Sequence, residues 1–252
     1  YLKEGRMVLF SGTGCQIAGL LSFLKDRTYK GNLITLDLIC GGIPSRILID
    51  KFISQAPYKV KRILSFRTKE TGWKPRGFRY NLKVEDENGK IYDYANKNNL
   101  ITTGFSLELT NRYSCYDCPF VGKNRKSDFT IGDYWGCIKY KEEHFDGISL
   151  IIAHTDKARQ FLSSLKDSLF YDKADMNLAI SHNHRLVTGH SIQQYFFERK
   201  LLAFFSSHLS DSVFSKVYAY TFSNKSPWIL LKVIRKVYGI VVVIIDRIGH
   251  KQ

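Results

Sequence analysis

The sequence lacks a secretory signal peptide. Its first ten residues, YLKEGRMVLF, contain neither a long apolar region nor a small-residue cleavage site. They also lack an initiator Met and enter an apolar stretch almost at once, so we expect the chain to be the later part of a longer protein. Five cysteines, an odd number in a chain without a signal, argue against a disulfide framework and favour metal binding or catalysis.

Acidic residues are in short supply. The 38 Lys and Arg residues outnumber the 23 Asp and Glu residues, which gives a formal net charge of +15. This excess favours anionic partners such as phosphate-bearing cofactors, acidic proteins or an anionic membrane. The densest basic runs are 59–67 and 123–126, and no nucleic-acid motif with the required spacing accompanies them. We therefore expect no specific binding of nucleic acid.

An uninterrupted apolar run long enough to span a membrane is also missing. Trp228–Ile248 is almost wholly apolar, but Lys232, Arg235 and Lys236 interrupt it. A spanning helix needs about 20 predominantly apolar residues, and three neighbouring cations argue against one. The segment instead favours a basic amphipathic helix on an anionic membrane surface, or a terminal helix docked on the protein. We expect a cytoplasmic protein, with peripheral attachment to the inner face of the membrane on the first interpretation.

The 252 residues suffice for a sizeable core, and 44% apolar and 24% charged residues are typical of a globular protein. Strand-like runs at 7–10 and 33–40 alternate with helical patterns at 15–25 and 45–54, the second with Ser45 as its cap. This order predicts parallel βα units. No internal repeat is visible.

The middle of the chain changes character. Alternating residues around an ENGK turn predict an antiparallel hairpin, and 148–155 predicts another strand followed by a helix begun by Asp156. The predicted fold class is α/β, a mixed sheet with parallel βα units, an antiparallel hairpin insertion and a helical C-terminal region. We expect a first domain over residues 1–200 and a helical, basic extension over 201–252.

Four cysteines could carry chemistry. Cys15 stands where a Gly-rich loop meets a helix, a place that favours a thiolate or a phosphate, although a small buried cysteine is the common alternative. Cys40 ends an apolar strand, and ligands gather beyond the carboxyl ends of strands in α/β sheets. Cys115 and Cys118 form a CxxC, which fits half a zinc site, half an iron–sulfur site or a redox dithiol. Four thiolates suit a [4Fe–4S] cluster or a structural zinc site, and the spacing does not choose between them.

Cys137 follows a Trp-Gly pair and is interpreted as a spare residue near this site. His182, His184 and His190 allow metal binding, but an ordinary polar loop is the preferred interpretation. The stretch SDFTIGDYWG combines acidic, hydroxyl, glycine and aromatic residues around a short strand at 129–131. It could hold a ring-bearing, hydroxyl-rich ligand such as a flavin, or be only a strand followed by a turn.

Taken together, these segments resemble the beta subunits of coenzyme F-420 hydrogenases and dehydrogenases, in the branch found in bacterial surface-polysaccharide gene clusters. GTGCQ resembles the family's Gly-Thr-Pro-Cys-Gln, with Gly14 for the proline, and CGGIPS resembles Cys-His-Gly-Val-Pro-Ser, with Gly41 for the histidine. FRTKETGW, SCYDCPF, RKSDFTIGDYWG and DGISLIIAHT follow in the family's order, with Thr68 in place of an acid. The resemblance extends from Val8 to Phe161, and more loosely to Lys200. Longer relatives carry a ferredoxin-like cysteine segment upstream, which is absent from this sequence.

The resemblance implies an oxidoreductase or electron-transfer protein that uses FAD and one [4Fe–4S] cluster. It implies a redox partner protein or ferredoxin-like domain and a small-molecule substrate, and it identifies no catalytic residue. The implied cluster ligands are Cys15, Cys40, Cys115 and Cys118. The implied FAD contacts are Gly12, Thr13, Gly14, Gln16, Arg125, Ser127, Asp128, Thr130, Gly132, Asp133 and Trp135. A non-catalytic glycan-assembly or adaptor protein with a structural four-cysteine metal site is the alternative.

Overall fold

A computed structural model of the chain describes residues 1–25, 31–66, 82–94, 110–122 and 125–188. It also describes the shorter pieces 101, 104–105, 108, 200, 204–205, 207–210, 212–213 and 216. The chain divides into two compact units, and each is described by itself. Unit 1 comprises Tyr1–Gly42, Lys69–Phe78 and Tyr113–His190, and unit 2 comprises Ile43–Thr68, Arg79–Arg112 and Ser191–Gln252.

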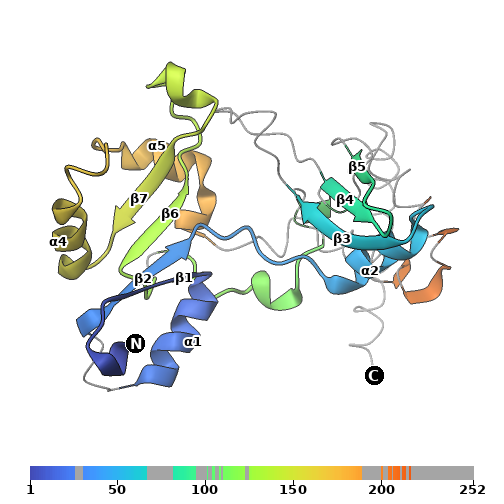
Figure 1. Cartoon of the computed structure of the whole chain (residues 1–252), viewed down its shortest axis with the longest axis horizontal. Coiled ribbons are helices and arrows are strands. Elements are labelled where there is room, and N and C mark those ends of the chain that lie inside the picture. Colours follow the sequence, from blue (N-terminus) through green and yellow to red (C-terminus); the bar gives the residue numbers. More distant parts are fainter. Residues whose placement is uncertain are drawn as a thin grey trace, which may run out of the picture. The chain divides into compact units, whose positions relative to one another are not determined.

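Unit 1 is built on a four-stranded mixed sheet (Figure 1). In spatial order its strands are β1 (Val8–Gly12), β2 (Leu33–Leu38), β6 (Phe129–Asp133) and β7 (Ser149–Ala153). β1, β2 and β6 run parallel, and β7 runs antiparallel to β6. The predicted parallel βα unit and the predicted strands of this region are therefore confirmed.

Helices cover both faces of this sheet, as parallel strands require. α4 (Asp156–Ser164) packs Ala158 against Ile34 and Phe129. On the other side, α5 (Met176–His182) and the short 3-10 helix η8 (His184–Leu186) pack against Leu150. Neighbouring residues of a strand point to opposite faces, and β7 contributes Ala153 to the first cluster and Ile152 to the second. The two clusters thus lie on opposite faces.

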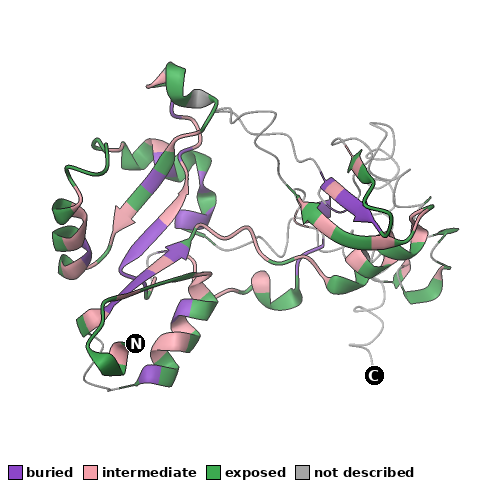
Figure 2. Ribbon diagram, in the orientation of Figure 1, coloured by how far each residue is buried: buried purple, intermediate pink, exposed green. Residues whose placement is uncertain are grey.

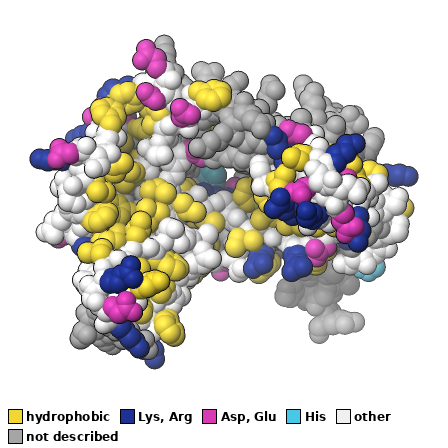
Figure 3. Space-filling model, viewed as in Figure 1, with side chains coloured by type: hydrophobic (Ala, Val, Ile, Leu, Met, Phe, Trp, Pro, Cys, Tyr) yellow, Lys and Arg dark blue, Asp and Glu magenta, His cyan; other side chains and the backbone are white. Residues whose placement is uncertain are grey.

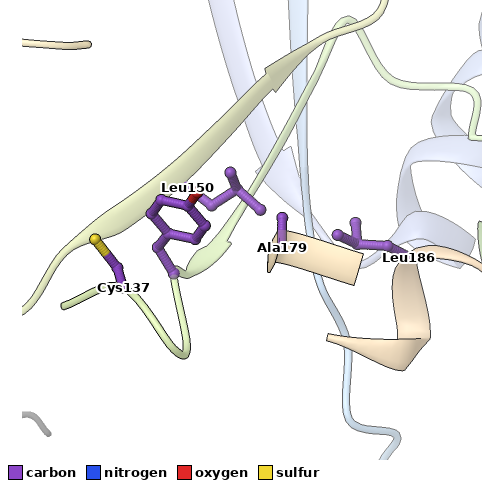
Figure 4. Packing of buried hydrophobic residues seen from close by; sticks show 5 residues of the cluster. Cys137, Leu150, Ala179 and Leu186 are labelled. Carbon is purple, nitrogen blue, oxygen red and sulfur yellow. The ribbon is translucent and has the colours of Figure 1, made fainter. Parts of the chain in front are cut away.

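The second of these clusters joins four elements (Figure 4). Cys137, in the turn after β6, packs in one cluster with Tyr134, with Leu150 of β7, with Ala179 of α5 and with Leu186 of η8. Cys137 is 4% exposed, so it is a core residue. Figure 2 shows how burial concentrates on the central strands of the sheet.

The remaining helix of unit 1 that matters for function is α1 (Gly14–Leu24), which packs beside β1 and β2. Its first turn follows β1 after a single residue, Thr13, whose backbone N–H donates to Gln16 Oε1 at 2.8 Å. This return of an N3 side chain to the N-cap amide fixes the start of the helix. The predicted strand, tight loop and helix are confirmed here.

The opposite surface of the sheet from α5 stays partly exposed. Leu9 is 59% exposed, Leu38 42% and Ile151 39%, although all three belong to strands. Hydrophobic side chains gather over these strands in the view of Figure 3. Among the described residues, α4 therefore covers only part of this face.

Unit 2 contains a three-stranded antiparallel sheet, β3 (Val60–Ser65), β4 (Leu82–Asp86) and β5 (Ile91–Tyr94). β4 and β5 form the predicted hairpin around ENGK. α2 (Arg46–Gln55) packs Ile49 and Phe52 onto the buried side of β4. Ser45 occupies the predicted cap position of α2, but its side chain makes no capping hydrogen bond.

Several predictions fall outside the described residues. They are most of the FRTKETGW segment, His190, nearly all of the helical pattern at 191–222, and Trp228–Ile248. The predicted domain boundary at residue 200 lies where only scattered residues are described, so it stays a prediction. In the part of the chain that the structure describes, no helix has the length and apolar character needed to cross a membrane.

Candidate functional site

The carboxyl ends of the parallel strands in unit 1 carry most of the predicted site residues. Cys15 lies in the first turn of α1, directly after β1, and Cys40 follows β2 by two residues. Cys115 ends the short 3-10 helix η5 (Tyr113–Cys115), and Cys118 follows it. All four thiols are free, and each has at least partial exposure to solvent.

Electrostatic coupling joins these four cysteines. Burial raises the pKa of the Cys40 thiol, and a hydrogen bond from the backbone N–H of Gly42, 3.3 Å from the sulfur, opposes that rise. The charges of Cys115, Cys15 and Cys118 raise the pKa of Cys40 further. Each of the three therefore lies within electrostatic reach of Cys40. Cys137 makes no such contribution to Cys40 and belongs to the core.

The four thiols do not form a group compact enough for one metal ion. Within the described residues, no set of three or more His, Cys, Asp or Glu side chains could hold a single ion as arranged. Thiolates are nevertheless the ligands that iron–sulfur clusters and zinc prefer. The donor set thus fits a thiolate-bound metal group in kind.

Hydrogen-bonding groups lie beside two of the sulfurs. Besides the Gly42 amide at Cys40, the Thr13 hydroxyl lies 3.1 Å from Cys15 Sγ. Hydrogen bonds to sulfur stabilise the thiolate form that binds metal. The predicted FAD contact Thr13 therefore also touches a predicted cluster ligand.

Gly14 brings the CxxC segment and the first loop together. A side-chain carbon at this position would lie 3.1 Å from the Phe120 carbonyl oxygen and 3.4 Å from Asp37 Oδ2. Phe120 is two residues past Cys118, so the loop that bears Cys15 packs directly on the segment that bears the CxxC. Gly14, which replaces the family's proline, has no side chain and therefore permits this close approach.

A buried ion pair lies beneath the same loop. Arg125 Nη1 is 2.9 Å from Asp37 Oδ2, and the two side chains are 3% and 1% exposed. Arg125 also donates to the backbone oxygens of Leu38 and Arg185, both at 3.3 Å. Because Leu38 is two residues before Cys40, Arg125 holds the end of the strand from which Cys40 projects.

The same carboxylate anchors a second chain of hydrogen bonds. Thr130 donates its hydroxyl proton to Asp37 Oδ1, so its oxygen accepts from His154 Nε2, 2.7 Å away. Burial lowers the pKa of His154, with the Arg125 charge adding to that effect and the charges of Asp37 and Asp128 opposing it. The histidine is thus held neutral, with its proton on Nε2.

This burial predicts a pH-dependent stability. The folded chain resists protonation of His154, so the unfolded chain binds the proton more readily, and the free energy of unfolding falls as pH drops below about 6.5. In His154→Gln, whose amide can still donate to Thr130, we expect a shallower fall between pH 7 and pH 5. Urea denaturation of both proteins across this range measures the difference. Equal slopes would show that His154 does not carry it.

Several of the predicted FAD contacts face the interior. Ser127 is 2% exposed, Asp128 6% and Thr130 0%. Asp128 precedes β6, and its carboxylate accepts hydrogen bonds from Thr35 and Thr155 and pairs with Lys157 at 3.1 Å. Burial raises the pKa of Asp128, but these bonds outweigh it and leave the pKa lowered. The side chains of these residues support the sheet in this arrangement.

The predicted contacts with accessible positions lie at the carboxyl end of the sheet. Gly12, Thr13, Gly14 and Gln16 surround the start of α1, and Gly132, Asp133 and Trp135 lie at the end of β6. Because β1 and β6 are parallel to β2, these two groups share one edge of the sheet with Cys40. In an open α/β sheet, ligands bind just beyond the carboxyl ends of the strands.

Sequence reasoning missed Asp37, Phe120 and His154. Asp37 left a signal, since it is the one acid in the otherwise apolar run LITLDLIC. The described part of the His182–His190 region, interpreted as a polar loop, is instead the end of α5 followed by η8, with Asn183, Arg185 and Leu186 buried. A single apolar residue among polar neighbours is too weak a pattern to predict a helix as short as η8.

Comparison with protein families decides the identity. Residues 5–177 match the family model that describes the C terminus of the beta subunit of coenzyme F420 hydrogenase/dehydrogenase. The chain belongs to this family. No curated protein matches the chain. The predicted family is thus confirmed, and it supports oxidoreductase or electron-transfer chemistry in general terms; the surface-polysaccharide branch stays a prediction.

The turn after the CxxC offers a direct test of packing around the site. Gly122 has φ +73°, and a side-chain carbon there would lie 2.8 Å from the Val187 carbonyl oxygen. Gly122→Ala is expected to destabilise the protein by roughly 2–3 kcal/mol, because a left-handed conformation and a backbone clash combine. Gly89 has φ +81° but open space around it, so Gly89→Ala should cost only about 1 kcal/mol. Chemical denaturation compares the two variants, and equal costs would contradict the clash.

Proposed function

We propose that the chain is a redox protein in which Cys15, Cys40, Cys115 and Cys118 hold a [4Fe–4S] cluster and the neighbouring loops hold FAD. The observation that carries the proposal is the packing of the loop before Cys15 on the segment that follows the CxxC, at Gly14 and Phe120; the charges of the other three thiols also act on Cys40. Cys15 and Cys40 follow parallel strands of unit 1, and Cys137, the remaining cysteine, is a core residue. The chemistry of four thiolates suits such a cluster.

The FAD part of the proposal draws on the glycines of the same edge. At Gly12 a side-chain carbon would lie 2.9 Å from Gln16 Oε1, so the Gln16 side chain packs directly on the backbone of this loop. The loop lies at the N-terminus of α1, where backbone N–H groups and the helix dipole favour phosphate. Trp135 supplies an aromatic ring just after β6, whose Gly132 packs its backbone against the Ile39 side chain. The net charge of +15 favours the same anionic cofactor.

When bound, the two groups would supply one-electron transfer and the pairing of electrons for hydride chemistry. The chain's own part is to hold them. Arg125 fixes the end of β2 before Cys40, Gly14 keeps the first loop against the CxxC segment, the Gly42 amide donates to Cys40, and the Thr13 hydroxyl lies in hydrogen-bond contact with Cys15. We infer a redox partner protein and a small-molecule substrate as the two ends of the electron path. A role in surface-polysaccharide synthesis is part of the same proposal.

Anaerobic purification followed by an absorption spectrum and metal analysis tests this function. About four irons and four sulfides per chain, with released FAD, would support it. A protein that stays colourless after cluster reconstitution and addition of FAD would overturn it. Zinc in such a colourless protein would favour the alternative, a non-catalytic adaptor of glycan assembly with a structural metal site.

The basic C-terminal segment has a separate test. Trp228–Ile248 lies outside the described residues, and its proposed role is attachment to an anionic membrane surface. Binding to liposomes with and without anionic lipid, measured for the full chain and for a chain ending at Pro227, decides the question. Equal binding of the two chains would exclude the proposed role.

A further inference from the structure

Residues at the end of the family match and just beyond it contact the segments that bear the predicted site. The match ends at residue 177, the second residue of α5. From there to Val187 the chain contacts the CxxC turn at Gly122, the guanidinium of Arg125 and the turn after β6. We name Asp175–Val187 the closing segment, and Asp133–Gly136 the β6 turn.

The β6 turn is held by this segment at three points. The Tyr134 hydroxyl donates to the Asp175 carbonyl at 3.1 Å and accepts from the Asp175 amide at 2.8 Å. Gly136, with φ +82°, leaves its backbone open to the ring of His182, and a side-chain carbon there would lie 2.6 Å from that ring. Asn183 Nδ2 donates to the Asp133 carbonyl at 3.2 Å.

Asn183 makes hydrogen bonds to α5, to η8 and to the β6 turn. It is 6% exposed and ends α5, where its backbone N–H donates to the Ala179 carbonyl at 2.9 Å. Its own carbonyl accepts from the Leu186 amide at 2.8 Å, which forms the turn of η8. Its side chain therefore transfers the fixed geometry of the helix end to the end of β6.

We propose that Asn183 is a positioning residue for the β6 turn and thereby for the ring of Trp135 at the cofactor edge. This rests on the proposed function in so far as the turn faces FAD. The side-chain amide is the required group, because a buried carbonyl oxygen accepts only from a donor. A carboxylate of the same size faces that oxygen without a proton to give.

Asn183→Asp and Asn177→Asp form a matched pair. Both change an amide to a carboxylate on α5, but Asn177 is exposed and Asn183 is buried. In the protein without cofactor, we expect Asn183→Asp to speed amide hydrogen exchange of residues 132–137 by about tenfold, because the turn opens more often. Asn177→Asp should leave this rate unchanged. Tyr134→Phe removes the bonds to Asp175 and should give the same local acceleration, so it serves if Asn183→Asp does not fold.

Two outcomes would overturn the inference: an unchanged exchange rate in both buried-site variants, or acceleration that extends equally through β6 and β7. The second would show general destabilisation. If the wild-type protein binds FAD, the dissociation constant of FAD should be about tenfold higher in Asn183→Asp than in the wild type, while the iron content stays the same. Failure of the wild-type protein to bind FAD would count against the proposed function, and unchanged FAD affinity in Asn183→Asp would count against the role of Asn183.

Discussion

Cys40→Ala is expected to lose nearly all bound iron. Cys40 is the thiol to which the other three couple, and it projects from the strand end that Arg125 holds. Removing it leaves three thiolates for a group that needs four, and the iron content should fall from about four per chain to below about one. Iron and sulfide analysis after anaerobic reconstitution measures the change, together with loss of the visible absorption.

Cys137→Ala is the matched control for this experiment. The same atom is removed from a cysteine that is 4% exposed and packs in the core beside Leu150. Its iron content should stay at the wild-type level, although some stability is lost to the cavity. Full iron in Cys40→Ala, or equal loss in both variants, would contradict the assignment of the four thiols.

Asp37→Asn is expected to cause the largest loss of stability. The substitution removes the charge that pairs with Arg125 in a setting where both side chains are at most 3% exposed. It also places an amide N–H₂ against one of two donors, Arg125 Nη1 or the Thr130 hydroxyl. An uncompensated buried charge costs about 3–5 kcal/mol, and the midpoint of urea denaturation should fall accordingly.

An exposed ion pair supplies the control for Asp37. Arg46 and Asp50 of α2 pair at 3.4 Å with side chains 85% and 57% exposed. Asp50→Asn should change the free energy of unfolding by no more than about 0.5 kcal/mol, since solvent screens such pairs. If Asp37→Asn cost as little, the pair with Arg125 would not hold the carboxyl edge of the sheet in place. Hydrogen exchange of β2 and β6 would locate any loss.

Local sequence signals predicted most of the sheet in unit 1. An apolar run followed by small residues and a helical pattern describes β1, its loop and α1, and the Asp156 signal describes the start of α4. The ENGK turn predicted the β4–β5 hairpin of unit 2 for the same reason, because turn residues and alternation act over a few positions. These elements depend on neighbours in sequence, which the sequence displays directly.

Contacts between distant residues could not be predicted in this way. Arg125 and Asp37 stand 88 positions apart, and nothing near Arg125 indicates that its charge is buried against a strand acid. Arg125 was therefore interpreted as a surface contact for FAD. The sequence predicted that Cys15 and Cys40 each follow a strand, whereas the approach of Phe120 to Gly14 depends on the path of a loop.

The order of the strands also governs when this site can exist during synthesis. β2 pairs with β6, and the Thr35–Asp128 hydrogen bonds join residues 93 positions apart, with segments of unit 2 encoded between them. A ribosome adds 93 residues in about 5–20 s. For that interval β2 has emerged without its central partner, and Cys15 and Cys40 have left the ribosome before either cysteine of the CxxC. Insertion of any metal group that uses all four thiols must therefore follow translation of the CxxC.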